Sequence, residues 1–441
     1  MMKKTRLFPI ILTVSALILS GCAGFQTSNS DEANVNEEGK TVVDFWSFWG
    51  SELRRPIIDK IVADFNASQD EIEVKHTYSP WGDIWTKELA AIAAGNPPDV
   101  VINDINATAI RGKENQAMNL SEFTGGDFPE KFYPELWNAT LYEGDSYGIP
   151  FNTDTRVLFY NKDAFEEVGL DPEDPPETWA ELEEYAAKLD VKKNGEYERL
   201  GFYPLWGVGY DVWLLNANGE NYFGEDNNTD TVNINTESNV EVLNWLKSWR
   251  ERIGVNVVNS FQAQIDSQQG NPFFSGDLAM IVQQPTFYQQ ISEYAEDLNF
   301  GVVQLPEYEP GNGHTSWGGG FVAEIPEGSS DPEAAWKFIE YLTDKEAQTY
   351  WAVENFDNVA NIEAAEAAAQ SDDLTEEGQM VYEMAVESME NTLLTPAPVE
   401  APGYYNYINP QVDEFFLGQK TAEEALAQAE ADIKSLIEKN Q

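Results

Sequence analysis

The feature that most constrains the fold is an alternation of strand-like and helix-like segments near the start of the chain. Residues 41–48 (TVVDFWSF) have the pattern of a buried strand, and residues 71–78 (EIEVKHTY) alternate apolar with polar side chains, as half-buried strands do. Residues 52–65 between them carry apolar side chains at helical spacing. A second helical segment, residues 83–94, and a third strand, residues 99–103 (DVVIN), repeat this unit. Strands that alternate with helices predict an α/β fold with a mostly parallel sheet.

Three later segments carry the Ser/Thr-x-x-Glu pattern of a capping box, in which a hydroxyl group and a glutamate bond the first free amides of a helix. The pattern begins at Thr178, Ser330 and Thr421. After Thr421, residues 426–436 place apolar side chains on one helical face, which we expect to pack on its own domain rather than on a partner. Further strands are expected at residues 156–161, 278–283, 300–305 and 321–325.

The N-terminus has the order of a secretory signal peptide. Basic residues precede an apolar run over residues 7–20, which is too short to span a bilayer as a mature helix. The run ends in LSGC, which is similar to the lipobox of bacterial lipoproteins, where the cysteine thiol receives a diacylglycerol. We therefore predict that residues 1–21 are a signal peptide and that Cys22 is lipidated; the alternative is a plain export signal with an incidental cysteine. Residues 22–40 are small, polar and acidic and predict a flexible tether.

The composition limits which partners this chain can take. It has 26 basic and 77 acidic residues, a formal net charge of -51 without long charged blocks. A nucleic-acid partner is therefore not expected, because binding one needs clustered Lys and Arg. Cys22 is the only cysteine, which excludes an internal disulfide and a cysteine metal cluster. The 42% of hydrophobic residues can fill sizeable cores, so a globular body of two or three domains is expected after the tether.

Five segments carry a family resemblance. They occur in this order: residues 93–101 (AAGNPPDVV), 147–163 (YGIPFNTDTRVLFYNKD), 165–179 (FEEVGLDPEDPPETW), 273–280 (FFSGDLAM) and 334–342 (AAWKFIEYL). Together they resemble the family 1 extracellular solute-binding proteins of ABC importers, the group that contains the maltose-binding proteins. The stretch over residues 147–163 is the most specific of the five.

The resemblance implies a two-lobed fold of the periplasmic-binding-protein kind, with an α/β sandwich in each lobe and a ligand cleft between them. It places chain crossings near Thr153–Thr155, His314–Trp317 and Glu354–Asn358. Lobe one would then contain residues 41–153 and 318–353, and lobe two residues 154–317 and 354–441.

The function implied is that of a monomeric binding lipoprotein, exported and anchored to the outer face of the cell membrane. It would bind a sugar or oligosaccharide, without a cofactor, and deliver it to the permease subunits of an ABC transporter for import.

Sugar recognition needs flat apolar faces for the C–H patches of a pyranose and a few planar polar groups for its hydroxyls. The chain has 13 Trp and 19 Tyr, several of them in loops, although packing in a core or at a hinge is an alternative for each one. The aromatic candidates for ligand binding are Trp49, Trp206, Tyr210, Trp317, Tyr404 and Tyr405. Other tryptophans beside loops are Trp46, Trp81 and Trp85.

The polar candidates are Asp104, Asp154, Gln284 and Gly319. Asp104 follows a predicted strand, where an α/β sheet presents ligand-facing groups. The resemblance implies that Asp154 contacts sugar, because it matches the acidic residue after the YGIPF-type strand, and that Tyr210 is a cleft tyrosine. The segment around Gln284 departs from the family where Thr286 replaces the usual aromatic, which leaves Phe287 or Tyr288 as a substitute.

Two other classes of protein compete with this interpretation: a secreted carbohydrate-active enzyme such as a glycoside hydrolase, and an adhesive surface lipoprotein. No catalytic or metal-binding motif is visible, and with 77 carboxylates a pair at a glycosidase-like spacing carries no information. His76 lies on the apolar side of a predicted strand and is expected in a core. The ligand could also be a peptide, a polyol or a polyol phosphate, but loop aromatics and few basic residues favour a neutral sugar.

Overall fold

The computed structural model describes residues 35–224, 227–265 and 270–441. The predicted signal peptide, Cys22 and most of the tether lie outside the described residues. The end of the predicted tether forms a turn: Val35 bridges to Thr41, and Asn36 Oδ1 accepts hydrogen bonds from the amides of Glu38 and Lys40. The described part of the chain therefore begins with a turn before the first strand.

Lobe one is built on a six-stranded sheet with the order β14-β6-β13-β3-β1-β2. Its strands are β1 (Thr41–Ser47), β2 (Ile72–Tyr78), β3 (Val100–Asp104), β6 (Ile149–Thr153), β13 (Gly320–Glu324) and β14 (Asn358–Val359). β1 pairs in parallel with β2 and β3, as the alternation of strands and helices predicts. β13 runs antiparallel to both β3 and β6, and β14 runs antiparallel to β6.

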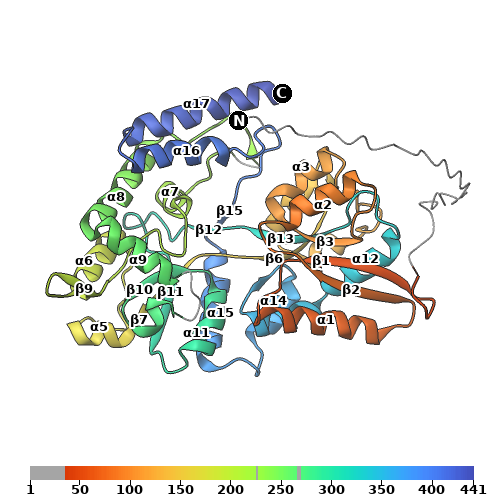
Figure 1. Ribbon diagram of the computed structural model, residues 1–441, viewed down its shortest axis with the longest axis horizontal. Helices are drawn as coiled ribbons and strands as arrows, with labels where there is room; N and C mark the ends of the chain where they lie inside the picture. Colours follow the sequence, from red (N-terminus) through yellow and green to blue (C-terminus); the bar gives the residue numbers. More distant parts are fainter. Residues whose placement is uncertain (1–34, 225–226, 266–269) are drawn as a thin grey trace, which may run out of the picture. The chain divides into compact units, whose positions relative to one another are not determined.

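Helices cover both faces of this sheet. Figure 1 shows α1 and α14 on one side and α2 and α3 on the other. The elements are α1 (Arg54–Ser68), α2 (Ile84–Ala93), η1 (Ile105–Ala107), α3 (Thr108–Lys113), η2 (Phe128–Lys131), α4 (Pro134–Ala139), α12 (Pro332–Leu342), α13 (Lys345–Asn355) and α14 (Ile362–Ala369), with the short pair β4 (Leu141–Tyr142) and β5 (Asp145–Ser146). The side chain of His76 in β2 lies between Ser47 of β1 and Asp59 of α1. Its Nε2 is 2.8 Å from Ser47 Oγ and its Nδ1 is 2.9 Å from Asp59 Oδ1. The side chain is buried, which confirms the prediction that it belongs to the core.

Lobe two is built on a three-stranded sheet with the order β10-β7-β11. Its strands are β7 (Val157–Asn161), β10 (Met280–Gln283) and β11 (Phe300–Gln304). Both neighbours run antiparallel to β7, so within the two main sheets the described strands pair in parallel only among β1, β2 and β3. The strands of lobe two come from distant parts of the chain, and local alternation of strands with helices does not determine their relative direction.

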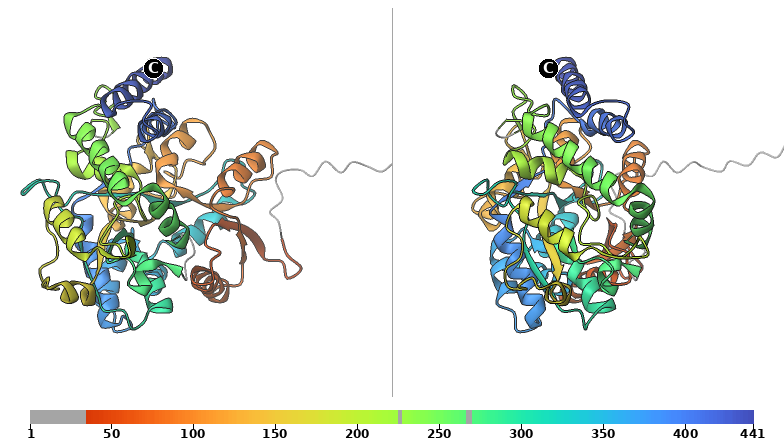
Figure 2. Two further views of the ribbon diagram at one scale, coloured as in Figure 1. Left: turned by 60° about the vertical axis from the view of Figure 1, so that its left-hand side comes forward. Right: turned by 90° about the vertical axis from the view of Figure 1, so that its left-hand side faces the viewer.

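Most of the helices belong to lobe two. They are α5 (Lys162–Val168), α6 (Trp179–Leu189), α7 (Tyr210–Asn218), α8 (Glu237–Ile253), α9 (Val255–Ile265), α10 (Pro272–Ser275), η5 (Pro285–Phe287), α11 (Tyr288–Tyr294), α15 (Glu376–Met389), α16 (Tyr405–Phe416) and α17 (Ala422–Asn440), beside the hairpin of β8 (Val191–Lys193) and β9 (Glu196–Arg199). α17 packs against α16 and α8, and both views of Figure 2 show α16 and α17 side by side. Leu426, Ala429 and Ile433 of α17 are buried in the lobe-two core, so the amphipathic helix packs on its own domain, as predicted.

The chain passes between the two sheets directly from β6 to β7 and again through β12 (Ser316–Gly318), which pairs in parallel with β15 (Thr392–Leu394). The third crossing differs from the expected position at residues 354–358. The chain adds β14 and α14 to lobe one after α13, because Val359, Ala364 and Ala368 are buried in the lobe-one core. α15 then contributes Val381 to the lobe-two core and Tyr382 to that of lobe one.

Two of the three predicted capping boxes are present, at Thr178 and Thr421. The prediction at Ser330 is wrong by one position. The helix begins at Pro332, and Asp331 caps it by accepting a hydrogen bond from the amide of Ala334 at 3.0 Å. A proline is favoured at the first helical position, so the residue before it becomes the cap. Ser330 instead donates to Asp99 Oδ1 at 3.0 Å.

Candidate ligand-binding site

The directions of the strands bring several polar residues to one edge of the lobe-one sheet. β1 and β3 are parallel, and β13 runs antiparallel to both β3 and β6, so the carboxyl ends of β1, β3 and β6 lie at the same edge. Asp104 ends β3, Asp154 follows β6, and Gly319 precedes β13. Ligands of open α/β sheets bind beyond this carboxyl edge. The structure thus places three of the predicted site residues at one edge.

Asp154 is bonded to residues of both lobes. Its Oδ1 accepts a hydrogen bond from the amide of Gly319 at 2.7 Å, and its Oδ2 accepts one from the side-chain amide of Gln284, the residue after β10. Arg156 Nη1 lies 3.1 Å from Asp154 Oδ2. These donors fix the carboxylate where the chain leaves lobe one.

Arg156 is a buried cation with several partners. Its Nη1 also donates to the carbonyl of Thr155 at 3.0 Å, and its guanidinium carbon lies 4.7 Å from the centre of the Trp317 ring. The nearby carboxylate of Asp154 balances its charge. Trp317 Nε1 is buried and, among the described residues, has no hydrogen-bond partner. A buried donor without a partner costs about 1–3 kcal/mol, which makes this atom a candidate donor to a ligand.

Asp104 accepts a hydrogen bond from the amide of Asn106 at 2.9 Å and thereby caps η1. Burial raises the pKa of Asp104 to about 6, with a further contribution from the charge of Asp154. A methyl group added to Gly319 would lie 3.8 Å from Asn106 Nδ2 and 3.9 Å from both Asp154 Oδ1 and Thr395 Oγ1. Polar groups therefore surround Gly319, and its missing side chain leaves room beside them for a ligand hydroxyl.

Glycines flank this position because two chain segments approach closely. A Cβ atom on Gly318 would lie 2.0 Å from the carbonyl oxygen of Asp154, and one on Gly320 would lie 2.4 Å from that of Asn152. Any side chain at either position would push the segments apart. The run of glycines at residues 318–320 is thus a consequence of how the crossing segments pack.

Trp49 and Trp206 lie in the cores rather than at this edge. Trp49 is 2% exposed and packs against Phe151 and Trp351, with ring centres 4.8 Å and 4.4 Å away. Trp206 is 1% exposed and stacks on Phe261 with ring centres 5.2 Å apart. For these two side chains the structure favours the alternative of core packing.

The three predicted tyrosines gather in lobe two. Tyr210 begins α7 and donates a hydrogen bond to Asn409 of α16, and the rings of Tyr404 and Tyr405 lie 4.2 Å apart at the start of α16. Burial raises the pKa of the neighbouring Asp211 to about 6. These hydrogen bonds and ring contacts are made within lobe two.

The two side chains considered as substitutes for an aromatic at Thr286 have other contacts. Phe287 is buried against Phe159 and Phe274, with ring centres 5.5 Å away in both cases. Tyr288 shares a hydrogen bond of 2.9 Å with Thr375 Oγ1. Both contribute to the packing of lobe two.

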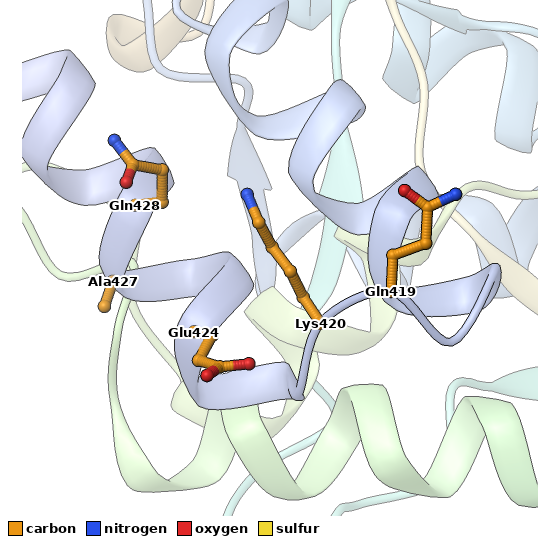
Figure 3. Close-up of a pocket in the computed structure, with 5 residues that line it drawn as sticks. All are labelled: Gln419, Lys420, Glu424, Ala427 and Gln428. Atoms are coloured by element: carbon orange, nitrogen blue, oxygen red, sulfur yellow. The ribbon is translucent and has the colours of Figure 1, made fainter.

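A surface hollow of about 520 Å³ lies elsewhere, where α16 meets α17, and its lining residues are Gln419, Lys420, Glu424, Ala427 and Gln428 (Figure 3). Lys420 Nζ lies 2.7 Å from Glu414 Oε2. The lining contains no aromatic ring, so it lacks the flat apolar face that a sugar site needs.

Within the described residues, no group of His, Cys, Asp and Glu side chains could hold a metal ion. No described helix is long and apolar enough to cross a membrane.

Sequence comparison with known proteins finds bacterial binding proteins. The sn-glycerol-3-phosphate-binding periplasmic protein UgpB of Shigella dysenteriae serotype 1 is 28% identical over 283 residues, which cover 62% of this chain and 62% of that protein. The matched part thus spans less than two thirds of that relative. A binding protein of Brucella abortus strain 2308 is 24% identical over 328 residues, or 72% of this chain and 74% of that protein.

Solved structures of similar fold cover more of the chain. CpMnBP1 with mannobiose bound has a TM-score of 0.77 and 26% identity, covering 89% of this chain and 99% of that one. T. maritima MalE3 with maltose bound has a TM-score of 0.73 and 22% identity, covering 90% of this chain and 99% of that one. At this identity the likeness supports the two-lobed fold and nothing further. Residues 60–380 match the family described as bacterial extracellular solute-binding protein. The chain therefore belongs to the family of bacterial extracellular solute-binding proteins.

Proposed function

We propose that this protein binds a neutral sugar or short oligosaccharide outside the cytoplasm and delivers it to the permease subunits of an ABC importer. The observation that carries the proposal is the polar cluster around Gly319, to which Asp104 and Asp154 contribute from lobe one and Gln284 from lobe two. A ligand held there would touch both lobes. The relative CpMnBP1, which has been solved with mannobiose and with mannotriose, supports a sugar as the ligand.

The charges at this cluster favour a neutral ligand over an anion. UgpB is named for binding sn-glycerol 3-phosphate, and a phosphate needs an uncompensated cation or a set of free amides. At the Gly319 cluster, Arg156 is already paired with Asp154, and Asp104 adds a further acidic group. Carboxylates and amides are suited to hydroxyl groups, which both donate and accept hydrogen bonds.

Within this proposal, Asp104, Asp154 and Gln284 contact ligand hydroxyls, the missing side chain of Gly319 makes room for one of them, and Trp317 offers a ring face and its unpaired Nε1–H. Tyr210 and Tyr405, which are partly buried, would form the lobe-two wall of the same site, and Tyr404, which is buried in the lobe-two core, would support Tyr405 from behind. The burial of Trp49 and Trp206 supports a packing role for both.

Export and anchoring complete the proposal. Membership of an extracellular family supports export, and the lipobox-like LSGC supports a diacylglycerol on Cys22 with a tether behind it. The protein would act as a monomer without a cofactor. Changing Cys22→Ser should release the protein from the membrane fraction, because the acidic body has little affinity for a lipid surface of its own. Equal retention of the variant would contradict anchoring through Cys22.

Thermal unfolding in the presence of mannobiose, mannotriose, maltose, maltotriose and sn-glycerol 3-phosphate tests the function. A sugar at 100 times its dissociation constant should stabilise the protein by about 2.7 kcal/mol, whereas the phosphate ester should have no effect. Stabilisation by sn-glycerol 3-phosphate alone would contradict a neutral ligand. Chromatography of the recovered sugar separates binding from glycoside hydrolysis, since a binding protein returns the oligosaccharide unchanged.

A further inference from the structure

An aromatic cluster lies at the edge of the lobe-one sheet that carries Asp104. Its members are Phe48, directly after β1, Trp81, between β2 and α2, Trp85 of α2, and Phe321 of β13. The ring centre of Trp81 lies 4.8 Å from that of Phe48, 4.6 Å from that of Trp85 and 5.4 Å from that of Phe321. All three neighbouring rings are close to perpendicular to it, at 87°, 72° and 84°.

The cluster is tied to the strand that ends in Asp104. Phe321 pairs with Asp104 in the register between β13 and β3, and Trp85 Nε1 donates to the carbonyl of Ile102 at 3.3 Å. The cluster is therefore built on the same pair of strands that positions Asp104 and Gly319.

Trp81 remains open to water although three rings support it. Its side chain is 49% exposed, while Phe48, Trp85 and Phe321 are each partly buried. Edge contacts of this kind are worth about 0.5–1.5 kcal/mol each beyond burial, so they hold the indole in one orientation without covering it. A large apolar ring that is fixed and exposed is available for stacking.

A second exposed ring lies at the same edge of the sheet, at the end of β2, where Tyr78 pairs with Ser47, the residue before Phe48. Tyr78 is 43% exposed, and its ring lies so close over Gly50 that a Cβ atom there would come within 2.2 Å of it. Among the large apolar side chains of the described residues that are exposed, Tyr78 and Trp81 are the aromatic ones. Exposed apolar residues scattered singly need no explanation, but two exposed aromatic rings at the sheet edge that carries Asp104 form a patch.

The charges near the patch favour a neutral occupant over an anionic one. Lys87 lies 3.3 Å from Asp83 Oδ2 and donates to Ser79 Oγ at 3.1 Å, so its charge is already balanced. Flat apolar rings beside carboxylates and amides suit a pyranose, which presents C–H groups on its faces and hydroxyls around its rim.

We propose that Trp81, together with Tyr78 at the same sheet edge, forms an outer stacking subsite that takes an additional pyranose unit of a neutral oligosaccharide whose inner unit is bound at Asp104 and Asp154. This inference rests on the proposed function and specifies its ligand: the protein selects for chain length, and an oligosaccharide binds more tightly than its shorter homologue because a further ring reaches Trp81.

Calorimetric titration with two ladders tests the subsite: mannobiose, mannotriose and mannotetraose, and maltose, maltotriose and maltotetraose. The wild type should gain affinity with length in the ladder it binds. Trp81→Ala should remove that gain, with about a tenfold loss for the longest member and little change for the disaccharide. Trp81→Phe should retain part of the gain. Leu417→Ala, which alters an exposed apolar side chain at the end of α16, should match the wild type throughout.

Each other result has a distinct meaning. If no member of either ladder binds to the wild type, the proposed function and the subsite both fail. If the ladder binds but Trp81→Ala weakens all lengths equally or none of them, the subsite is overturned while the proposed function stands. If Trp81→Ala binds every length normally yet stimulates the transporter less, Trp81 is a contact for the permease rather than for sugar. Equal melting temperatures of the wild type and both Trp81 variants show that the fold is intact.

Discussion

The side-chain amide of Gln284 in lobe two donates a hydrogen bond to the carboxylate of Asp154, at the point where the chain leaves lobe one. The same carboxylate accepts the amide of Gly319 and pairs with Arg156. One side chain thus connects both lobes and the crossing segment between them. A ligand hydroxyl that bonds to Asp154 or Gln284 would join this network and link binding to the relative position of the lobes.

Replacing Asp154 should affect both ligand affinity and stability. Asp154→Ala removes an acceptor for ligand hydroxyls, and we expect at least about a tenfold loss of sugar affinity by calorimetry. It also leaves the buried Arg156 without its carboxylate, so the melting temperature should fall. The double variant Asp154→Ala, Arg156→Met should recover stability but not affinity. Full affinity in Asp154→Ala would exclude this carboxylate from the site.

Asp104 should make folding stability depend on pH in a defined window. Burial raises its pKa to about 6 from an ordinary value of 3.8, so the folded state binds the proton more tightly than the unfolded state. Ionisation of Asp104 therefore destabilises the fold, and this cost is absent below about pH 4 and complete above about pH 6. Asp104→Asn should gain stability over the wild type as the pH rises through that window. A constant difference between pH 4 and pH 7 in denaturant titrations would contradict the shift.

Trp317 should report ligand binding through its fluorescence. Its ring contacts the Arg156 guanidinium and its Nε1 lacks a partner, so a ligand that bonds there would change the surroundings of the indole. Saturating sugar should shift the intrinsic emission of the wild type, and Trp317→Phe should lose most of that shift. Trp49→Phe and Trp206→Phe should keep it, since both indoles are buried in the cores. An undiminished shift in Trp317→Phe would remove Trp317 from the site.

Arg111 should be essential for the stability of lobe one. It lies between two buried glutamates, bonded to Glu88 through Nη2 and to Glu324 Oε2 through Nε at 2.7 Å. Burial raises the pKa of Glu88 even with this partner. Arg111→Met leaves both carboxyls uncompensated and should cost about 3–5 kcal/mol of unfolding free energy. Lys113→Met, at the end of the same helix, should cost little in the same chemical denaturation; equal losses would show that the network is not the cause.

The sequence predicts lobe one better than lobe two. Alternating strands and helices over residues 41–103 give the parallel part of the lobe-one sheet because each crossover is local. β7, β10 and β11 come together from distant segments, so no local pattern sets their antiparallel order. The position predicted for the third crossing is wrong for a related reason. β14 is only two residues long, and its place in the sheet depends on pairing with β6 rather than on its own sequence.

The residues of the candidate site also differ in how well the sequence alone predicts them. Asp104 could be located because it stands at the end of a strand that is visible in the sequence, and Asp154 because of the family resemblance over residues 147–163. Aromatic residues near strand ends could not be sorted, since Trp49 and Trp81 both stand beside loops and only the folded chain buries one and exposes the other. The network that joins Gln284 to Asp154 spans 130 positions of the chain, and no local signal points to it.

Calorimetric titration of the soluble Cys22→Ser protein with mannobiose and with maltose, alongside its Asp154→Asn variant, tests whether the Gly319 cluster binds a neutral sugar. We expect saturable binding of one sugar molecule per chain for at least one of the two sugars, no cleavage of the sugar, and about a tenfold weaker affinity in the variant, in which the amide bonds Gln284 and Arg156 less well than the carboxylate does. Absence of binding to both disaccharides, or binding that is identical in Asp154→Asn, would contradict this proposal.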